Sequence, residues 1–154
     1  MLISELRLTD DLSDKHPDVI ASAYWQMASA TAKSGEHAPM FFIVTGRRVV
    51  QLVAQDEFKD MDGKNRVSML LRQMARNADV VIVIATAGRP SRFRNSCELL
   101  SVFVQHRQFG STFWSAEITN GPNGREIGTV STDCAVRYEN RARGVEASAS
   151  ARQA

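Results

Sequence analysis

The chain has 154 residues, of which 44% are hydrophobic and 23% are charged, and its formal net charge is +2. This length suits one domain, and so small a charge is not typical of a nucleic-acid-binding domain. The two cysteines, Cys97 and Cys134, form no paired motif, which indicates free thiols in a reducing compartment. Acidic residues interrupt the N-terminal segment, and no apolar run approaches the roughly 18 residues of a membrane helix. We therefore expect a cytoplasmic protein without membrane partners.

The first half of the chain predicts a helix followed by a pair of strands. Residues 2–8 have some strand character, and a helix is expected from Pro17, which suits a first helical turn, to Gly35, which suits a C-terminal stop. The 40–45 and 49–54 segments predict the two strands of an antiparallel hairpin. The expected apolar face of the helix consists of Ile20, Ala23, Tyr24, Met27 and Ala28.

The second half predicts another helix and several strands. An unbroken apolar run from Val80 to Ala85 indicates a strand that is buried on both faces, and therefore a central one. Strands are also expected at 97–105, 112–119 and 126–131, the last two being joined by a turn-rich segment. The stripe expected on the second helix consists of Val67, Leu70, Leu71, Met74, Ala75 and Ala78. Residues 142–154 predict a flexible tail after a single domain of residues 1–141.

These elements predict an α+β fold. We expect a single, mostly antiparallel sheet of roughly five to six strands, with both helices packed on the same face. The order α-β-β-α-β-β-β is similar to that of profilin-like and roadblock-type modules, which commonly serve as interaction or sensor scaffolds. Fold-level similarity of this kind does not define an activity.

A more detailed resemblance covers residues 38–130. It rests on the segments Ala38–Val44, Leu71–Gln73, Ala78–Val83, Glu98–Leu100 and Ile127–Gly128. In this pattern the chain resembles a large group of uncharacterised bacterial and phage proteins. That group usually has Glu and Trp just after the central strand, where this chain has Thr86-Ala87-Gly88. The resemblance implies a bacterial or phage origin and no established activity.

An arginine-rich loop follows the central strand. One glycine followed by Pro90 does not match a phosphate-binding loop, which needs several converging backbone N–H groups. Arg89, Arg92 and Arg94 are nevertheless candidates for contact with an anion or an acidic partner, including nucleic acid. The alternatives are a solvated loop or ion pairs with acidic residues such as Glu98.

Catalytic and metal-binding patterns are weak. His106 and the Asp133-Cys134 pair could belong to an enzyme of unknown class only if they meet in space, which a sequence does not show. The three histidines are widely scattered and have no metal-ligand spacing. We therefore assign no catalytic residue, metal or cofactor, and we lean against an enzyme.

The aromatic residues give the strongest functional signal. Phe113 and Trp114 are consecutive in a strand and must point to opposite faces of the sheet. Trp25 lies toward the edge of the apolar stripe of the first helix. If the helices cover only one face, the other needs a cover from another part of the chain or from a partner subunit. Trp25, Phe113 and Trp114 are therefore candidates for an interaction surface. The leading hypothesis is a protein-interaction or self-assembling module that forms homo-oligomers, and the alternative is a nucleic-acid-associated protein acting through the arginine loop.

Overall fold

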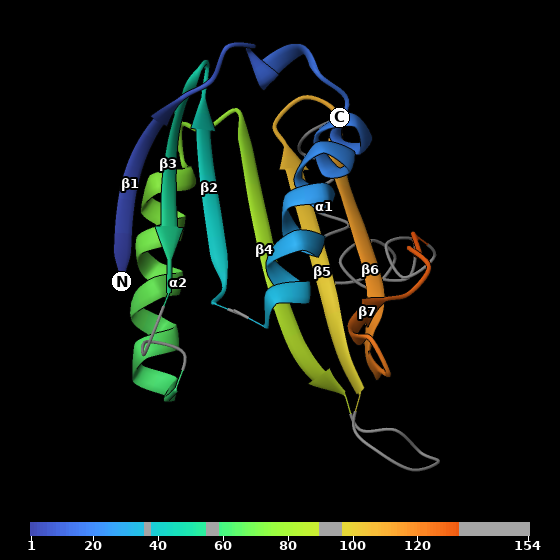
Figure 1. The fold of residues 1–154 in the computed structure, drawn as a ribbon. Coiled ribbons are helices and arrows are strands. Elements are labelled where there is room, and N and C mark those ends of the chain that lie inside the picture. Colours follow the sequence, from blue (N-terminus) through green and yellow to red (C-terminus); the bar gives the residue numbers. More distant parts are fainter. Residues whose placement is uncertain (36–37, 55–58, 90–96, 133–154) are drawn as a thin grey trace, which may run out of the picture.

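The computed structural model describes residues 1–35, 38–54, 59–89 and 97–132. It contains a seven-stranded sheet in which all neighbouring strands are antiparallel, in the order β1-β3-β2-β4-β5-β6-β7 (Figure 1). The elements are β1 (Leu2–Arg7), the 3-10 helix η1 (Leu12–Asp14), α1 (Pro17–Ser34), β2 (Met40–Thr45), β3 (Arg48–Val53), α2 (Met61–Ala75), β4 (Val80–Arg89), β5 (Cys97–His106), β6 (Gly110–Gly121) and β7 (Gly124–Ile127).

This architecture confirms the α+β class, and its seven strands exceed the expected five to six. The segment with some strand character, residues 2–8, contains β1, which the expected order of elements left out and which pairs with β3 at one edge of the sheet. The predicted tail, residues 142–154, lies outside the described residues. Gly35 ends α1 with a φ of 84°, a left-handed value that glycine adopts without strain, so the predicted helix stop is confirmed.

β4 is the central strand, as its unbroken apolar run predicts. Val80, Ile82 and Ile84 point to one face and are buried, while Val81 and Val83 point to the other. Both faces of β4 therefore need a cover, and a helix with a single apolar stripe can cover only one.

The two helices lie on opposite faces of the sheet, which corrects the expectation that they share one face (Figure 1). α1 packs mainly over β5, β6 and β7. α2 packs through Val67, Leu70, Leu71 and Met74 on the other face, against residues of β2, β3 and β4. A core on each side of β4 follows from this arrangement.

The buried stripe of α1 differs in phase from the predicted one. It consists of Pro17, Ile20, Ala21, Trp25, Ala28 and Ala32, while Ala23 and Met27 are exposed. The predicted and observed stripes share Ile20 and Ala28. Because many residues of α1 are alanines, the side-chain volumes on the two stripes differ little and do not favour one of them. Burial of the large indole of Trp25 accounts for the observed phase.

Tyr24 lies beside this stripe and is half-buried. Its ring packs edge-on against Phe42, with ring centroids 5.0 Å apart. Burial raises the pKa of the Tyr24 phenol above its ordinary value of 10.0, because ionisation would place a charge in a poorly solvated site. Since the folded-state pKa is the raised one, this contribution to stability is complete below the ordinary value and is lost as the pH rises through the folded-state pKa.

The wild type is expected to lose unfolding free energy as the pH rises from about 8 to about 11. We expect Tyr24→Phe to lose less over the same range, because it has no phenol to ionise. Urea denaturation at both pH values, applied to the wild type and the variant, measures this difference. An identical loss in the two proteins would contradict the role of Tyr24. Comparing each protein with itself at about pH 8 removes any constant effect of deleting the hydroxyl group.

Candidate functional site

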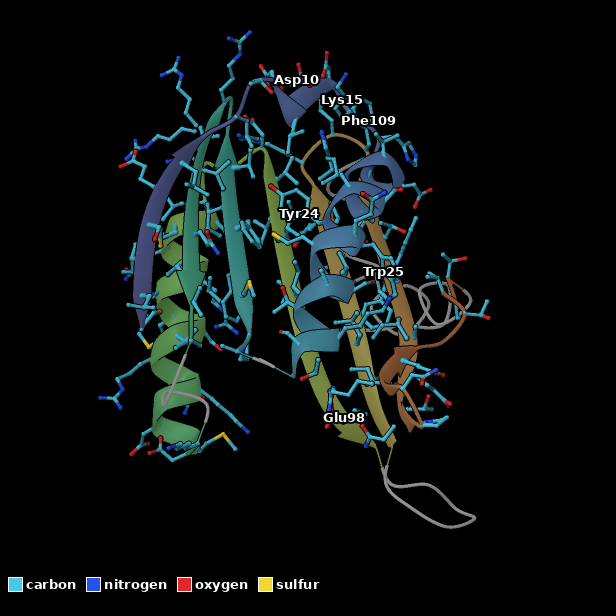
Figure 2. All side chains as sticks on the ribbon, in the orientation of Figure 1. Asp10, Lys15, Tyr24, Trp25, Glu98 and Phe109 are labelled. Atoms are coloured by element: carbon cyan, nitrogen blue, oxygen red, sulfur yellow. The ribbon has the colours of Figure 1, made fainter. Side chains whose placement is uncertain are left out.

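Trp25 and Trp114 meet between α1 and β6. Their ring centroids are 6.3 Å apart and their planes are tilted by 53°. The indole Nε1 of Trp114 donates a hydrogen bond to the Asp18 carboxylate, in the first turn of α1, at 3.4 Å. Trp25 is 9% exposed and projects from the middle of α1, as Figure 2 shows. These two predicted residues therefore hold α1 against the sheet.

Phe113, the third predicted aromatic residue, is not brought together with them. It is half-buried on the opposite face of β6, directly across from Phe103 of β5. This is the face on which α2 packs farther along the sheet, against β2, β3 and β4. The opposite orientations predicted for Phe113 and Trp114 are confirmed.

The arginine loop falls largely outside the described residues. Arg89 is the last residue of β4, where its backbone pairs with that of Cys97, while Arg92 and Arg94 lie in the undescribed segment 90–96. The role of the three arginines stays a prediction.

Glu98, which we considered as a partner for these arginines, contacts Arg125 of β7. Nη2 of Arg125 donates to the Glu98 carboxylate at 2.8 Å, and its Nε donates to the Ala32 carbonyl at 3.0 Å. Arg125 thus places a positive charge at the C-terminal end of α1, where the helix dipole favours it. We did not single out this residue, because its partners are far away in the sequence.

His106 is buried and both of its ring nitrogens have backbone partners. Nε2 lies 3.2 Å from the Leu12 carbonyl oxygen, while Nδ1 accepts from the N–H groups of Gln108 at 3.0 Å and Phe109 at 3.3 Å. The carbonyl can only accept, so these partners assign the proton to Nε2. The ring therefore connects η1 to the β5–β6 turn, at the end of the sheet where Figure 2 labels Asp10, Lys15 and Phe109. Asp133 and Cys134 lie outside the described residues.

Among the described residues, no group of three or more His, Cys, Asp or Glu side chains is placed to hold a metal ion. Asp60, in the acidic connector, caps α2 by accepting from the Gly63 N–H at 2.6 Å. A cavity between α1 and the sheet, near Ala28, Met40 and Leu100, has a volume of about 10 Å³ and could hold at most about one water molecule. No helix in the described ranges is long and apolar enough to cross a membrane.

The outer edge of β1 is the most exposed apolar feature of the described sheet. Leu2, Ile3 and Leu6 are 56%, 59% and 48% exposed, and we call these three side chains with the outer backbone of Leu2–Arg7 the β1 edge. Among the described strands, β1 pairs only with β3. Natural sheets usually protect such an edge with charges, proline or a covering segment, because its backbone can pair with another chain.

The orientation of the β1 backbone follows from one hydrogen bond. The Leu8 N–H donates to the Arg47 carbonyl at 2.7 Å, just beyond the end of the β1–β3 ladder. Because backbone groups alternate along an antiparallel strand, the even-numbered residues of β1 bond to β3. The N–H and C=O groups of Ile3, Glu5 and Arg7 therefore point away from the sheet.

The two faces of β1 have different chemistry. Leu2 and Leu6 lie opposite Val53 and Val49, on the face that carries α1, but α1 packs over the other half of this face (Figure 1). On the face of α2, Glu5 forms an ion pair with Arg48 of β3. The β1 edge thus combines outward backbone groups with a row of uncovered leucines.

Comparison with family models, curated proteins and solved structures found no match to this chain.

Proposed function

We propose that this protein is an interaction module that binds another polypeptide through the β1 edge. The observation that carries the proposal is the coincidence, on one strand, of outward backbone groups with the exposed side chains of Leu2, Ile3 and Leu6. An extended strand that pairs with such an edge gains main-chain hydrogen bonds, while its side chains contact the exposed apolar ones.

The positions of the other aromatic and exposed apolar residues support the choice of the β1 edge as the binding surface. Trp25 and Trp114 contact each other across the interface between α1 and the sheet, so their indole rings already serve that interface. The exposed apolar side chains of the two helices are scattered: Val19 and Met27 on α1, Met61 and Met69 on α2. Single exposed apolar residues are common on protein surfaces, whereas three on one edge strand are not.

Leu6→Lys tests the proposal. The substitution removes one of the exposed leucines of the β1 edge and places a hydrated ammonium group where a partner strand would pack. We expect at least about a 10-fold loss of binding, which corresponds to about 1.4 kcal/mol. Met69→Lys makes the same change on α2 at a residue that is 62% exposed, and we expect it to leave binding unchanged.

The experiment is a pull-down with the tagged wild type and the two tagged variants. It compares the polypeptides that each one retains, first from an untagged preparation of the same protein and then from a cell lysate. Because both positions are exposed, each variant should keep its stability to within about 0.5 kcal/mol, which circular dichroism and urea denaturation check. The proposal fails if the wild type retains no polypeptide, or if Leu6→Lys retains the same polypeptides as the wild type.

A further inference from the structure

The β1 edge is also suited to a particular partner, which is a second copy of this chain. Resting on the proposed function, we infer that two β1 strands pair antiparallel about a two-fold axis at Ser4, so that the two sheets become continuous. The inference rests on the order of side chains along Leu2–Arg7 and on which backbone groups point outward.

Symmetry limits the registers that are available. A two-fold axis perpendicular to the sheet places the α1 faces of both copies on the same side of the continuous sheet. The even-numbered residues of β1 have their side chains on this face, so they lie opposite even-numbered residues of the second copy. With the axis at Ser4, Leu2 of one copy lies opposite Leu6 of the second copy, and the reverse. The leucines of both copies then form one apolar cluster on the face that α1 leaves uncovered.

The backbone groups match in the same register. Ile3 of one copy lies opposite Glu5 of the second copy, and both residues have their N–H and C=O groups on the outer edge. Residues placed in this way exchange both hydrogen bonds. Ser4 then faces Ser4 of the second copy in the closer, non-hydrogen-bonded type of pair, where a small side chain fits well.

Two registers shifted toward the C-terminal end of β1 are less favourable. An axis at Glu5 would place two glutamates directly opposite each other, which is destabilising for like charges. An axis at Leu6 would pair Glu5 with Arg7 of the second copy, but it would leave Leu2 and Ile3 without cross-strand partners. The axis at Ser4 pairs Leu2–Leu6 of each copy, and each Glu5 keeps its ion pair with Arg48 of its own copy.

A disulfide at the axis tests the register. The Cα atoms of a non-hydrogen-bonded antiparallel pair are about 4.5 Å apart, which lies within the range that a disulfide spans. In the full-length chain at about 100 µM, a concentration suited to a small and transient interface, we expect Ser4→Cys to form a disulfide-linked dimer under mild oxidation. Non-reducing peptide mapping by mass spectrometry assigns the bond to position 4 and separates it from bonds of the native cysteines.

Two control variants make the result specific. Ser68→Cys places a thiol at an exposed serine of α2, and Leu6→Cys places one at the axis of the shifted register. Because association raises the local concentration of facing thiols, we expect Ser4→Cys to form its bond at least about 10-fold faster than either control. Equal rates for Ser4→Cys and Ser68→Cys, or a faster reaction of Leu6→Cys, would overturn the inference.

The failures of the two proposals are distinguishable. If Leu6→Lys abolishes binding while Ser4→Cys does not crosslink, the β1 edge binds a different partner or a different register, and only the symmetric pairing is wrong. If binding is unaffected by Leu6→Lys, the proposed function fails as well.

Discussion

Replacing Trp25 with alanine is expected to lower the free energy of unfolding by about 3 to 5 kcal/mol, the usual cost of deleting a buried tryptophan side chain. Trp25 is 9% exposed, and its ring packs against Trp114 in the interface that holds α1 on the sheet. The variant would lose this aromatic contact and leave a cavity beside β6. Urea denaturation followed by circular dichroism measures the effect.

Met27→Ala is the matched control, since Met27 lies on the same helix and is 39% exposed. We expect its cost to stay within about 0.5 kcal/mol. The sequence pattern alone predicts that Met27→Ala is the more destabilising substitution, because it places Met27 in the apolar stripe and Trp25 toward the edge of that stripe. Equal costs for the two variants would show that the stripe of α1 is misplaced.

The elements themselves could be predicted from the sequence because their signals are local. The run from Val80 to Ala85 identifies the central strand, and the alternation around Trp114 identifies β6 and both of its faces. Pro17 and Gly35 mark the ends of α1 through the local backbone chemistry of proline and glycine.

The placement of the helices could not be predicted in the same way. An apolar stripe indicates that a helix packs on something, but it does not indicate which face of the sheet receives it. The useful signal is that β4 is apolar on both of its faces. If both helices packed on the same face, the other face of β4 would lack a cover, so each face needs its own helix.

The side-chain contacts that stabilise the ends of the sheet are also long-range. Arg125 bonds to Ala32, 93 residues earlier, and His106 bonds to Leu12, 94 residues earlier. Neither pair has a sequence spacing that could reveal it. The β1 edge is an intermediate case: Leu2, Ile3 and Leu6 indicate a strand, but only the pairing with β3 shows that this strand lies at an edge.

We expect His106→Ala to lower the free energy of unfolding by about 2 to 3 kcal/mol, because the ring is buried and its removal leaves three backbone groups without their partner. Gln105→Ala, at the exposed neighbouring residue, should cost less than about 0.5 kcal/mol. Urea denaturation measures both variants.

His106→Asn separates the hydrogen bond to Leu12 from the hydrogen bonds to Gln108 and Phe109. The asparagine oxygen can occupy the position of Nδ1 and accept from Gln108 and Phe109, but the shorter side chain does not reach the Leu12 carbonyl. We therefore expect a cost between those of Gln105→Ala and His106→Ala, with faster amide exchange confined to the η1 region. If His106→Asn instead destabilises the protein as much as His106→Ala, the bond to Leu12 is the dominant one. If His106→Ala is as stable as the wild type, the ring does not stabilise this end of the sheet, and a chemical role for His106 becomes the better explanation of its burial.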